Sequence, residues 1–175
     1  STSRPEWFSN QPEKEYREAV SLITRANWSG ASAHEGRPPP EHRTLHVAGR
    51  LDIDSSGLLV LTQDGRIARQ LIGPESKVEK EYAVRVEGDL PQNTLSQLNG
   101  NMNLDGRRLK PVEVARTGEQ TLRFVLIEGR KRQIRRMCDL VGLPIVSLTR
   151  VRIGQVRLGG LRRGQWRYLR AGEHF

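Results

Sequence analysis

Two segments of the chain carry residues whose types and spacing could do chemistry. In the first, residues 49–59, the carboxylates of Asp52 and Asp54 and the hydroxyls of Ser55 and Ser56 lie between strand-like stretches. An ionised aspartate can act as a nucleophile or as a general base. The same Asp-Ser-Ser-Gly run is also an ordinary turn, in which aspartate and serine satisfy backbone donors. The residue types alone leave both interpretations open.

The second segment, residues 128–137, is strongly basic. Five basic residues fall within seven positions at the start of an amphipathic pattern: Arg130, Lys131, Arg132, Arg135 and Arg136. Such a cluster is often a solvated face. However, positive charges at a helix N-terminus oppose the helix dipole, and the backbone donors there favour anions. A phosphate or a carboxylate is therefore the expected partner.

The composition favours a polyanionic partner. The chain has 29 Lys and Arg against 20 Asp and Glu, a formal charge of +9 in 175 residues, which suits nucleic acid before membrane or acidic protein. Cys138 is the only cysteine, so an internal disulfide is excluded. The four histidines lack ligand-like spacing, and we expect no metal and no cofactor.

The length fits one domain covering residues 1–175. No apolar run approaches the roughly 18 residues of a membrane span, and no charged-then-apolar signal pattern opens the chain. We therefore expect a soluble cytoplasmic protein that acts as a monomer.

Periodicity predicts an α+β fold with a mainly antiparallel mixed sheet flanked by helices and loops. Helices are expected at 66–72, 91–99 and 131–141. In the last of these, Ile134, Met137, Cys138 and Val141 form one apolar stripe. Strands are expected at 58–62, 81–87, 111–116, 121–128, 145–158 and 166–170, with a hairpin turn at 117–120.

The N-terminal part has a weaker pattern. Residues 17–25 are expected to hold a short ordered element, and residues 29–43, which contain three consecutive prolines, a mobile loop. Residues 1–20 give no firm prediction.

Four motifs in order resemble those of the bacterial ribosomal RNA pseudouridine synthases of the RsuA/RluB/RluF type. Residues 49–62 resemble the family's catalytic motif, and residues 80–82, Lys-Glu-Tyr, resemble the strand that carries its active-site tyrosine. Residues 128–137 resemble its arginine-bearing motif, and 158–167 resemble its C-terminal signature. The resemblance covers roughly residues 45–170 and implies the pseudouridine synthase fold. The N-terminal strand is less similar, and the small N-terminal RNA-binding domain of many relatives is not seen in the sequence.

The resemblance implies that the chain isomerises a uridine to pseudouridine in structured RNA. Asp52 would start the reaction as a nucleophile or a base. Arg135 would pair with it and keep it ionised, with Arg136 as the rival for that role. Tyr82 would stack on the target base and help to remove the C5 proton, although a tyrosine on a strand is usually core.

The same resemblance assigns substrate-binding residues. A base inside a stack cannot be reached, so it must be flipped out, and Arg50 would fill the space or contact a phosphate. Ile134 would line the pocket, or belong to the core. The expected phosphate contacts are Lys131, Arg132, Arg136, Arg162 and Arg163.

Ribosomal RNA of the large subunit is the favoured substrate, possibly within an assembling subunit, and tRNA is an alternative. A second hypothesis is a catalytically weak or inactive RNA-binding or ribosome-assembly factor on the same fold. The presence of Asp52, Tyr82 and Arg135 together argues against it, since RNA binding alone needs none of them. A third hypothesis, a basic module unrelated to RNA, predicts weak, salt-insensitive RNA association.

Overall fold

The computed structural model describes residues 19–29 and 38–175, and its centre is an antiparallel sheet. The strands lie in the order β10-β9-β4-β8-β7, and every pair along this path is antiparallel. Their bounds are Val156–Arg157 for β10, Ile145–Ile153 for β9, Lys80–Val86 for β4, Thr121–Leu126 for β8 and Val112–Gly118 for β7.

Shorter elements complete the fold. The strand β2 (Ser56–Gly57) pairs with β9 in parallel, which makes the sheet mixed. Two further antiparallel pairs are β1 (His46–Ala48) with β3 (Val60–Thr62), and β5 (Asn103–Leu104) with β6 (Arg107–Arg108). The helices are α2 (Gly65–Ile72), α3 (Gln92–Leu98) and α4 (Gln133–Leu140), with 3-10 turns at Arg25–Asn27 and His42–Thr44.

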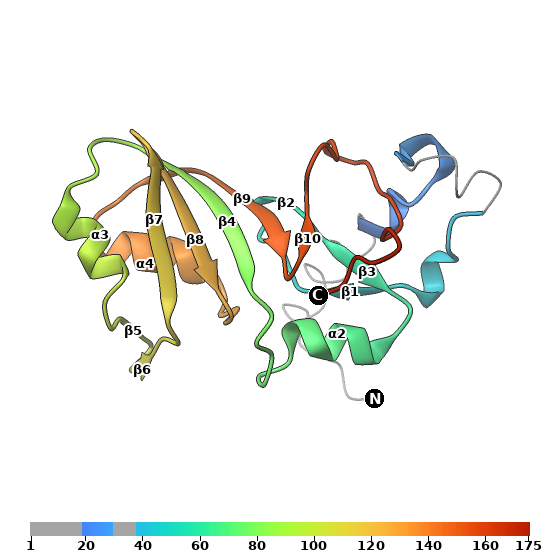
Figure 1. Ribbon diagram of the computed structural model, residues 1–175, viewed down its shortest axis with the longest axis horizontal. Helices are drawn as coiled ribbons and strands as arrows, with labels where there is room; N and C mark the ends of the chain where they lie inside the picture. Colours follow the sequence, from blue (N-terminus) through green and yellow to red (C-terminus); the bar gives the residue numbers. More distant parts are fainter. Residues whose placement is uncertain (1–18, 30–37) are drawn as a thin grey trace, which may run out of the picture.

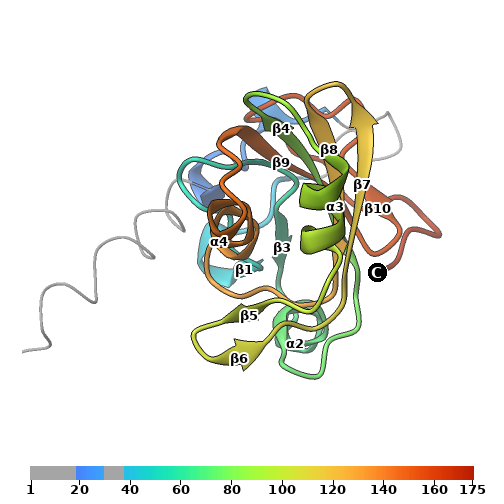
Figure 2. The same ribbon diagram turned by 90° about the vertical axis from the view of Figure 1, so that its left-hand side faces the viewer.

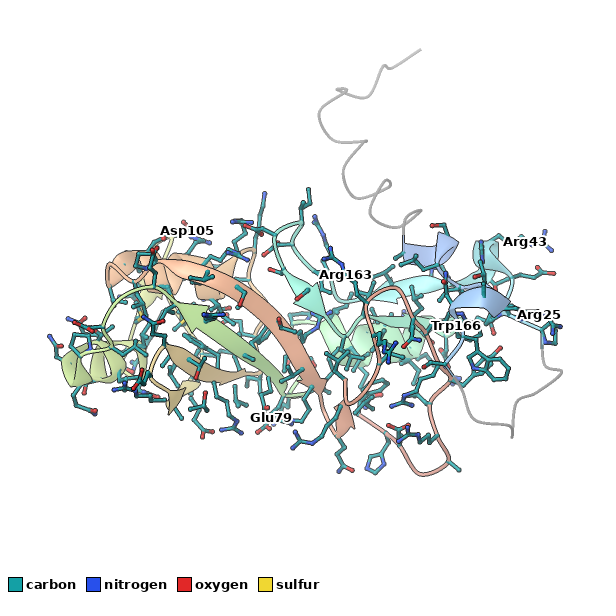
Figure 3. The ribbon with its side chains drawn as sticks, turned by 90° about the horizontal axis from the view of Figure 1, so that it is seen from above. Arg25, Arg43, Glu79, Asp105, Arg163 and Trp166 are labelled. Carbon is teal, nitrogen blue, oxygen red and sulfur yellow. The ribbon has the colours of Figure 1, made fainter. Side chains whose placement is uncertain are left out.

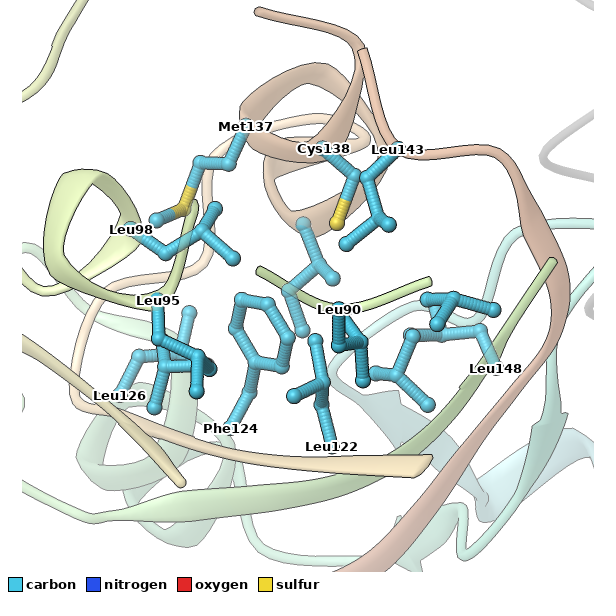
Figure 4. Packing of buried hydrophobic residues seen from close by; sticks show 14 of the residues in the cluster. Leu90, Leu95, Leu98, Leu122, Phe124, Leu126, Met137, Cys138, Leu143 and Leu148 are labelled. Atoms are coloured by element: carbon cyan, nitrogen blue, oxygen red, sulfur yellow. The ribbon is translucent and has the colours of Figure 1, made fainter. Parts of the chain in front are cut away.

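The described residues form three hydrophobic clusters, one of them around Val20, Ile23, Leu45 and Trp166, and the two larger ones lie in different halves of the molecule. Helices α3 and α4 pack at one end, while β1, β3 and α2 lie at the other, and β4 and β9 run between them (Figure 1). The end with α3 and α4 faces the viewer in Figure 2. Its core is centred on Phe124 and Met137, which are fully buried (Figure 4). The second core includes Leu58, Leu71 and Ile153.

The structure confirms the α+β class, the three helices, the strand over 81–87 and the hairpin over 111–128. The apolar stripe of the last helix is also confirmed, because Ile134, Met137 and Cys138 are buried and Gly142 follows with a φ of +69°. Residues 1–18 and 30–37 lie outside the described part, so the expectations for them are untested there.

One predicted strand is wrong, and two others are divided. The strand expected at 145–158 forms two antiparallel strands, β9 and β10. Residues 166–170 form no strand, because within this range only Trp166 makes a β-bridge, a single parallel one to Trp28. Next to it, the side chain of Arg167 bonds to Glu173. The apolar run 58–62 is divided between two sheets. Leu58 bonds to β9 of the central sheet, whereas β3, which pairs with β1, begins at Val60. None of the helices in the described ranges has the length and apolar character that a membrane span requires.

Candidate active site

The loop that carries Asp52 is docked on β9 through glycine. Gly57 pairs with Arg150, and the amide of Leu58 donates to the carbonyl of Arg150 at 2.8 Å. Gly57 has a φ of +110°, and a Cβ added there would lie 2.2 Å from the Arg150 carbonyl oxygen. Any larger residue would therefore push the loop away from β9. The hydroxyl of Ser56 lies 3.0 Å from that of Thr149 and strengthens the same junction.

Asp52 itself is at the first position of a tight turn. The amide of Ser55 donates to its backbone carbonyl at 2.9 Å, which fixes the direction in which the loop leaves Asp52. The residue is half-buried. Among the residues that the structure describes, none makes a hydrogen bond or ion pair with its carboxylate, so the carboxylate remains available to react.

Arg135 of α4 reaches this loop, as the sequence predicts, but its contacts are with the neighbours of Asp52. Its Nη2 donates to the carbonyl of Asp54 at 2.6 Å and to the hydroxyl of Ser55 at 3.3 Å, and its Nε lies 3.3 Å from Oδ1 of Asp54. The side chain is 14% exposed, so these contacts are largely shielded from water. The expected pairing of Arg135 with Asp52 is not present in this geometry.

Arg136, the rival candidate, faces elsewhere. It forms an ion pair with Asp105 at 2.6 Å. Asp105 lies at the end of the molecule far from Arg25 and Arg43 (Figure 3). Of the two arginines, only Arg135 contacts the loop.

Arg132 supplies a second contact between α4 and the loop. Its Nη1 and Nη2 donate to Oδ1 and Oδ2 of Asp54 at 3.0 and 2.9 Å, a bidentate pair. These bonds are the main reason why the pKa of Asp54 is lowered. They also raise the pKa of Arg132, and the charge of Asp52 contributes to that increase. The anion expected at the start of α4 is thus a carboxylate of the protein.

Tyr82 lies on β4, half-buried, against the core beneath α4. Its register partner on β9 is Arg150. Directly opposite residues of an antiparallel pair share one face with Cβ atoms about 5 Å apart. Tyr82 is therefore placed one strand away from the strand on which the Asp52 loop is docked. In the part of the chain that the structure describes, Tyr82 and Asp52 share no hydrogen bond.

The remaining sequence candidates divide into core and surface. Ile134 is 4% exposed and belongs to the hydrophobic core, so the structure favours the packing role over the pocket wall. Arg50 is an exposed residue whose carbonyl accepts from Arg150. Lys131, Arg162 and Arg163 are exposed, and Figure 3 shows Arg163 on the C-terminal segment.

A cavity lies beside the Asp52 loop, but Asp52 is not among its lining residues. Its volume is about 1130 Å³, and it is bounded by β3, the loop at Leu51 and Ser55, and the C-terminal segment from Val156 onward. Arg162 and Arg163 stand among its lining residues, whereas Asp52, Tyr82 and Arg135 do not.

Sequence reasoning missed three residues next to the site. The sequence pattern predicts only a turn role for Asp54. A second carboxylate two residues after Asp52 is nevertheless a pattern that could indicate a site residue. Arg150 is a basic residue inside an apolar strand, and it is 4% exposed. Lys80 is half-buried, and burial, with the charge of Arg150, lowers its pKa. Within the described ranges, no group of three or more His, Cys, Asp or Glu is arranged to hold a metal ion.

Comparison with known proteins gives one consistent family. A model of the family described as RNA pseudouridylate synthase matches residues 10–140. The chain is 42% identical over 154 residues to ribosomal large subunit pseudouridine synthase E of Xanthomonas campestris pv. campestris, covering 77% of this chain and 80% of that protein. It is 38% identical over 160 residues to ribosomal large subunit pseudouridine synthase B of Yersinia pestis, covering 88% of this chain and 50% of that protein.

A solved structure agrees with the sequence matches. The crystal structure of a pseudouridylate synthase superimposes with a TM-score of 0.71 at 32% identity, over 75% of this chain and 59% of that one. The chain thus spans most of the E-type relative and about half of the B-type relative. The family match covers more than half of the chain and agrees with the resemblance seen in the motifs. The chain belongs to the RNA pseudouridylate synthase family, a family of isomerases.

Proposed function

We propose that the chain converts a uridine of large-subunit ribosomal RNA into pseudouridine, with Asp52 as the catalytic carboxylate. The main support for this proposal is the docking of the Asp52 loop. The loop pairs with β9, and it accepts hydrogen bonds from Arg132, just before α4, and from Arg135 within α4. Two relatives that act on the large subunit, by their names, support the choice of RNA.

The reaction breaks the N–C glycosidic bond, turns the base and joins the sugar to C5, after which the C5 proton leaves. Asp52 would begin it by attacking the sugar carbon or by removing a sugar proton. Both roles need the ionised form. Arg132 is an electrostatic neighbour of Asp52, since the charge of Asp52 contributes to the raised pKa of Arg132.

The target base would be flipped out of its stack to reach Asp52, with Tyr82 against its face. The exposed cations Lys131, Arg162 and Arg163 would contact phosphates, which position RNA without reading its sequence. Arg50, beside Asp52 in the sequence, would contact the RNA where the base leaves. The enzyme is proposed to act as a cytoplasmic monomer.

The test is the substitution Asp52→Asn, which keeps the size and removes the charge. Large-subunit RNA from cells lacking the gene is incubated with each protein, and pseudouridine is measured by chemical labelling and reverse transcription. We expect D52N to bind the RNA and form no pseudouridine. The control is Asp89→Asn, at an exposed carboxylate after β4, which should keep the wild-type rate.

The outcomes separate the competing functions. Unchanged activity of D52N would refute the assignment of the carboxylate. RNA binding with no pseudouridine even in the wild-type protein would favour the inactive RNA-binding factor. Modification of tRNA but not of large-subunit RNA in a parallel reaction would refute the choice of substrate and leave the chemistry intact.

A further inference from the structure

Arg150 of β9 is a buried cation that touches both flanks of the Asp52 loop. It is 4% exposed. Its Nε donates to the carbonyl of Leu58 at 2.8 Å, and its Nη1 donates to the carbonyl of Arg50 at 3.2 Å. Its Nη2 is buried and has no hydrogen-bond partner among the described residues. No carboxylate in the described part forms an ion pair with it.

Such an arrangement is costly for stability alone. A buried charge without a counter-charge carries a large desolvation penalty, and an unsatisfied buried donor adds to it. Two carbonyls offset only part of this. An apolar residue of similar size would satisfy the packing of β9 at lower cost, so core stability does not explain an arginine here.

A β-bulge separates this arginine from Arg152, the next arginine of the strand. On β9, Arg150 pairs with Tyr82 and Arg152 pairs with Glu81, with a register shift between the two pairs. Side chains two residues apart in a regular strand share a face. The extra residue, Val151, puts them on opposite faces instead. Arg152 accordingly pairs with Glu81 and Glu79, away from the loop.

We propose that Arg150 is a positioning residue for catalysis, which holds the Asp52 loop in register with Tyr82. This rests on the proposed function of Asp52. One guanidinium fixes residue 50, two positions before Asp52, and residue 58, which follows the turn, while its own strand pairs with Tyr82. Gly49 belongs to the same junction, since a Cβ there would lie 3.7 Å from Nη1 of Arg150.

The planar fork of the guanidinium is what the geometry requires. Two donors at a fixed separation bridge two carbonyls that belong to different ends of one loop. A lysine ammonium is a single point donor on a flexible stem and cannot hold both carbonyls in one orientation. Arg150→Lys therefore keeps the charge and the bulk and removes the bridge.

The experiment measures the single-turnover rate of pseudouridine formation and the RNA dissociation constant for Arg150→Lys, Arg152→Lys and Asp52→Asn. A displacement of about 1 Å in a catalytic group can cost on the order of 100-fold in rate. We expect R150K to lose about 10- to 100-fold in rate with less than a twofold change in dissociation constant. R152K, which changes a half-buried arginine of the same strand, should stay within twofold of wild type in both.

Two further measurements separate positioning from folding. Guanidinium ion at tens of millimolar, compared with sodium chloride at equal ionic strength, should raise the rate of Arg150→Ala at least about fivefold and leave the corresponding Arg152→Ala unchanged. Gly57→Ala, which forces the loop from β9 without touching the guanidinium, should lose rate as R150K does.

The outcomes are distinguishable. If D52N loses activity while R150K keeps the wild-type rate, the role of Arg150 is refuted and the function stands. If R150K and R152K lose rate in equal measure, in proportion to lost thermal stability, Arg150 is structural only. If D52N keeps full activity, the proposed function fails first.

Discussion

Arg132 and Asp54 form a two-point ion pair between the start of α4 and the Asp52 loop, with distances of 3.0 and 2.9 Å. The two residues are 78 positions apart in the sequence. Arg132 adopts a left-handed backbone conformation, φ +52°, which is uncommon for a residue other than glycine. The backbone strain and the ion pair occur at the same residue, so we infer that the contact serves the loop rather than the helix.

The first prediction concerns this ion pair. Asp54→Asn should lower the single-turnover rate several-fold while lowering the free energy of unfolding by no more than about 1 kcal/mol, because both side chains are 40–50% exposed. The control is Asp105→Asn, which removes the partner of Arg136 on the same helix but lies off the loop. Equal losses of rate in both variants would show that α4, not the loop, is the sensitive element.

The second prediction concerns the hydroxyl of Tyr82. Tyr82→Phe keeps the ring and its packing, so the RNA dissociation constant and the unfolding midpoint should change little. If the hydroxyl takes part in removing the C5 proton, the rate of product formation should fall by about 100-fold or more, the usual range for a proton-transfer group. A rate within twofold of wild type would restrict Tyr82 to stacking, and Tyr82→Leu would then be the variant that loses activity.

Local sequence patterns predict the helices and strands but not the contacts between them. The helix stripe of Ile134, Met137 and Cys138 and the alternation of Tyr82, Val84 and Val86 each follow from one short stretch of sequence, and the structure confirms both. Such periodicity reports which face of an element is apolar. It therefore predicts the class of fold and most element positions.

The junctions depend on residues far apart, which periodicity does not report. The two-residue strand β2 exists only because Ser56 and Gly57 pair with Thr149 and Arg150, more than 90 positions away. The bulge at Val151 turns Arg152 away from the face that Arg150 shares with Leu148. Residues 166–170 are expected to form a strand, but the side chain of Trp166 stacks on Trp28 instead. The motif resemblance predicts roles for Asp52, Tyr82 and Arg135. The contacts of Asp54 with α4 are visible only in the three-dimensional structure.

The third prediction concerns RNA affinity and salt. Lys131 is exposed and lies two positions before the first residue of α4. Lys131→Ala should reduce the magnitude of the slope of log affinity against log salt by about 1, as expected for the loss of one phosphate contact. The double variant of Arg162 and Arg163 to Ala should reduce it by about 2. The control is Arg43→Ala, an exposed arginine already paired with Glu41, which should leave the slope unchanged.

The fourth prediction concerns acid stability of the C-terminal segment. The pKa of Glu173 is lowered from 4.5 to about 2, mainly because its carboxylate accepts two hydrogen bonds from Arg167, at 2.7 and 2.9 Å. Because the folded-state pKa is the lower one, Glu173 contributes stability fully above about pH 4.5 and loses it as the pH falls toward 2. The free energies of unfolding of wild type and Glu173→Gln, measured in urea, should thus differ by a constant amount from pH 7 to 5 and converge below pH 4.

The control is Glu87→Gln, at an exposed carboxylate without an ion pair in the described part of the chain. Its free energy of unfolding should differ less from that of wild type at neutral pH. A difference for Glu173→Gln that stays constant down to pH 3 would mean that Arg167 does not hold this carboxylate in solution.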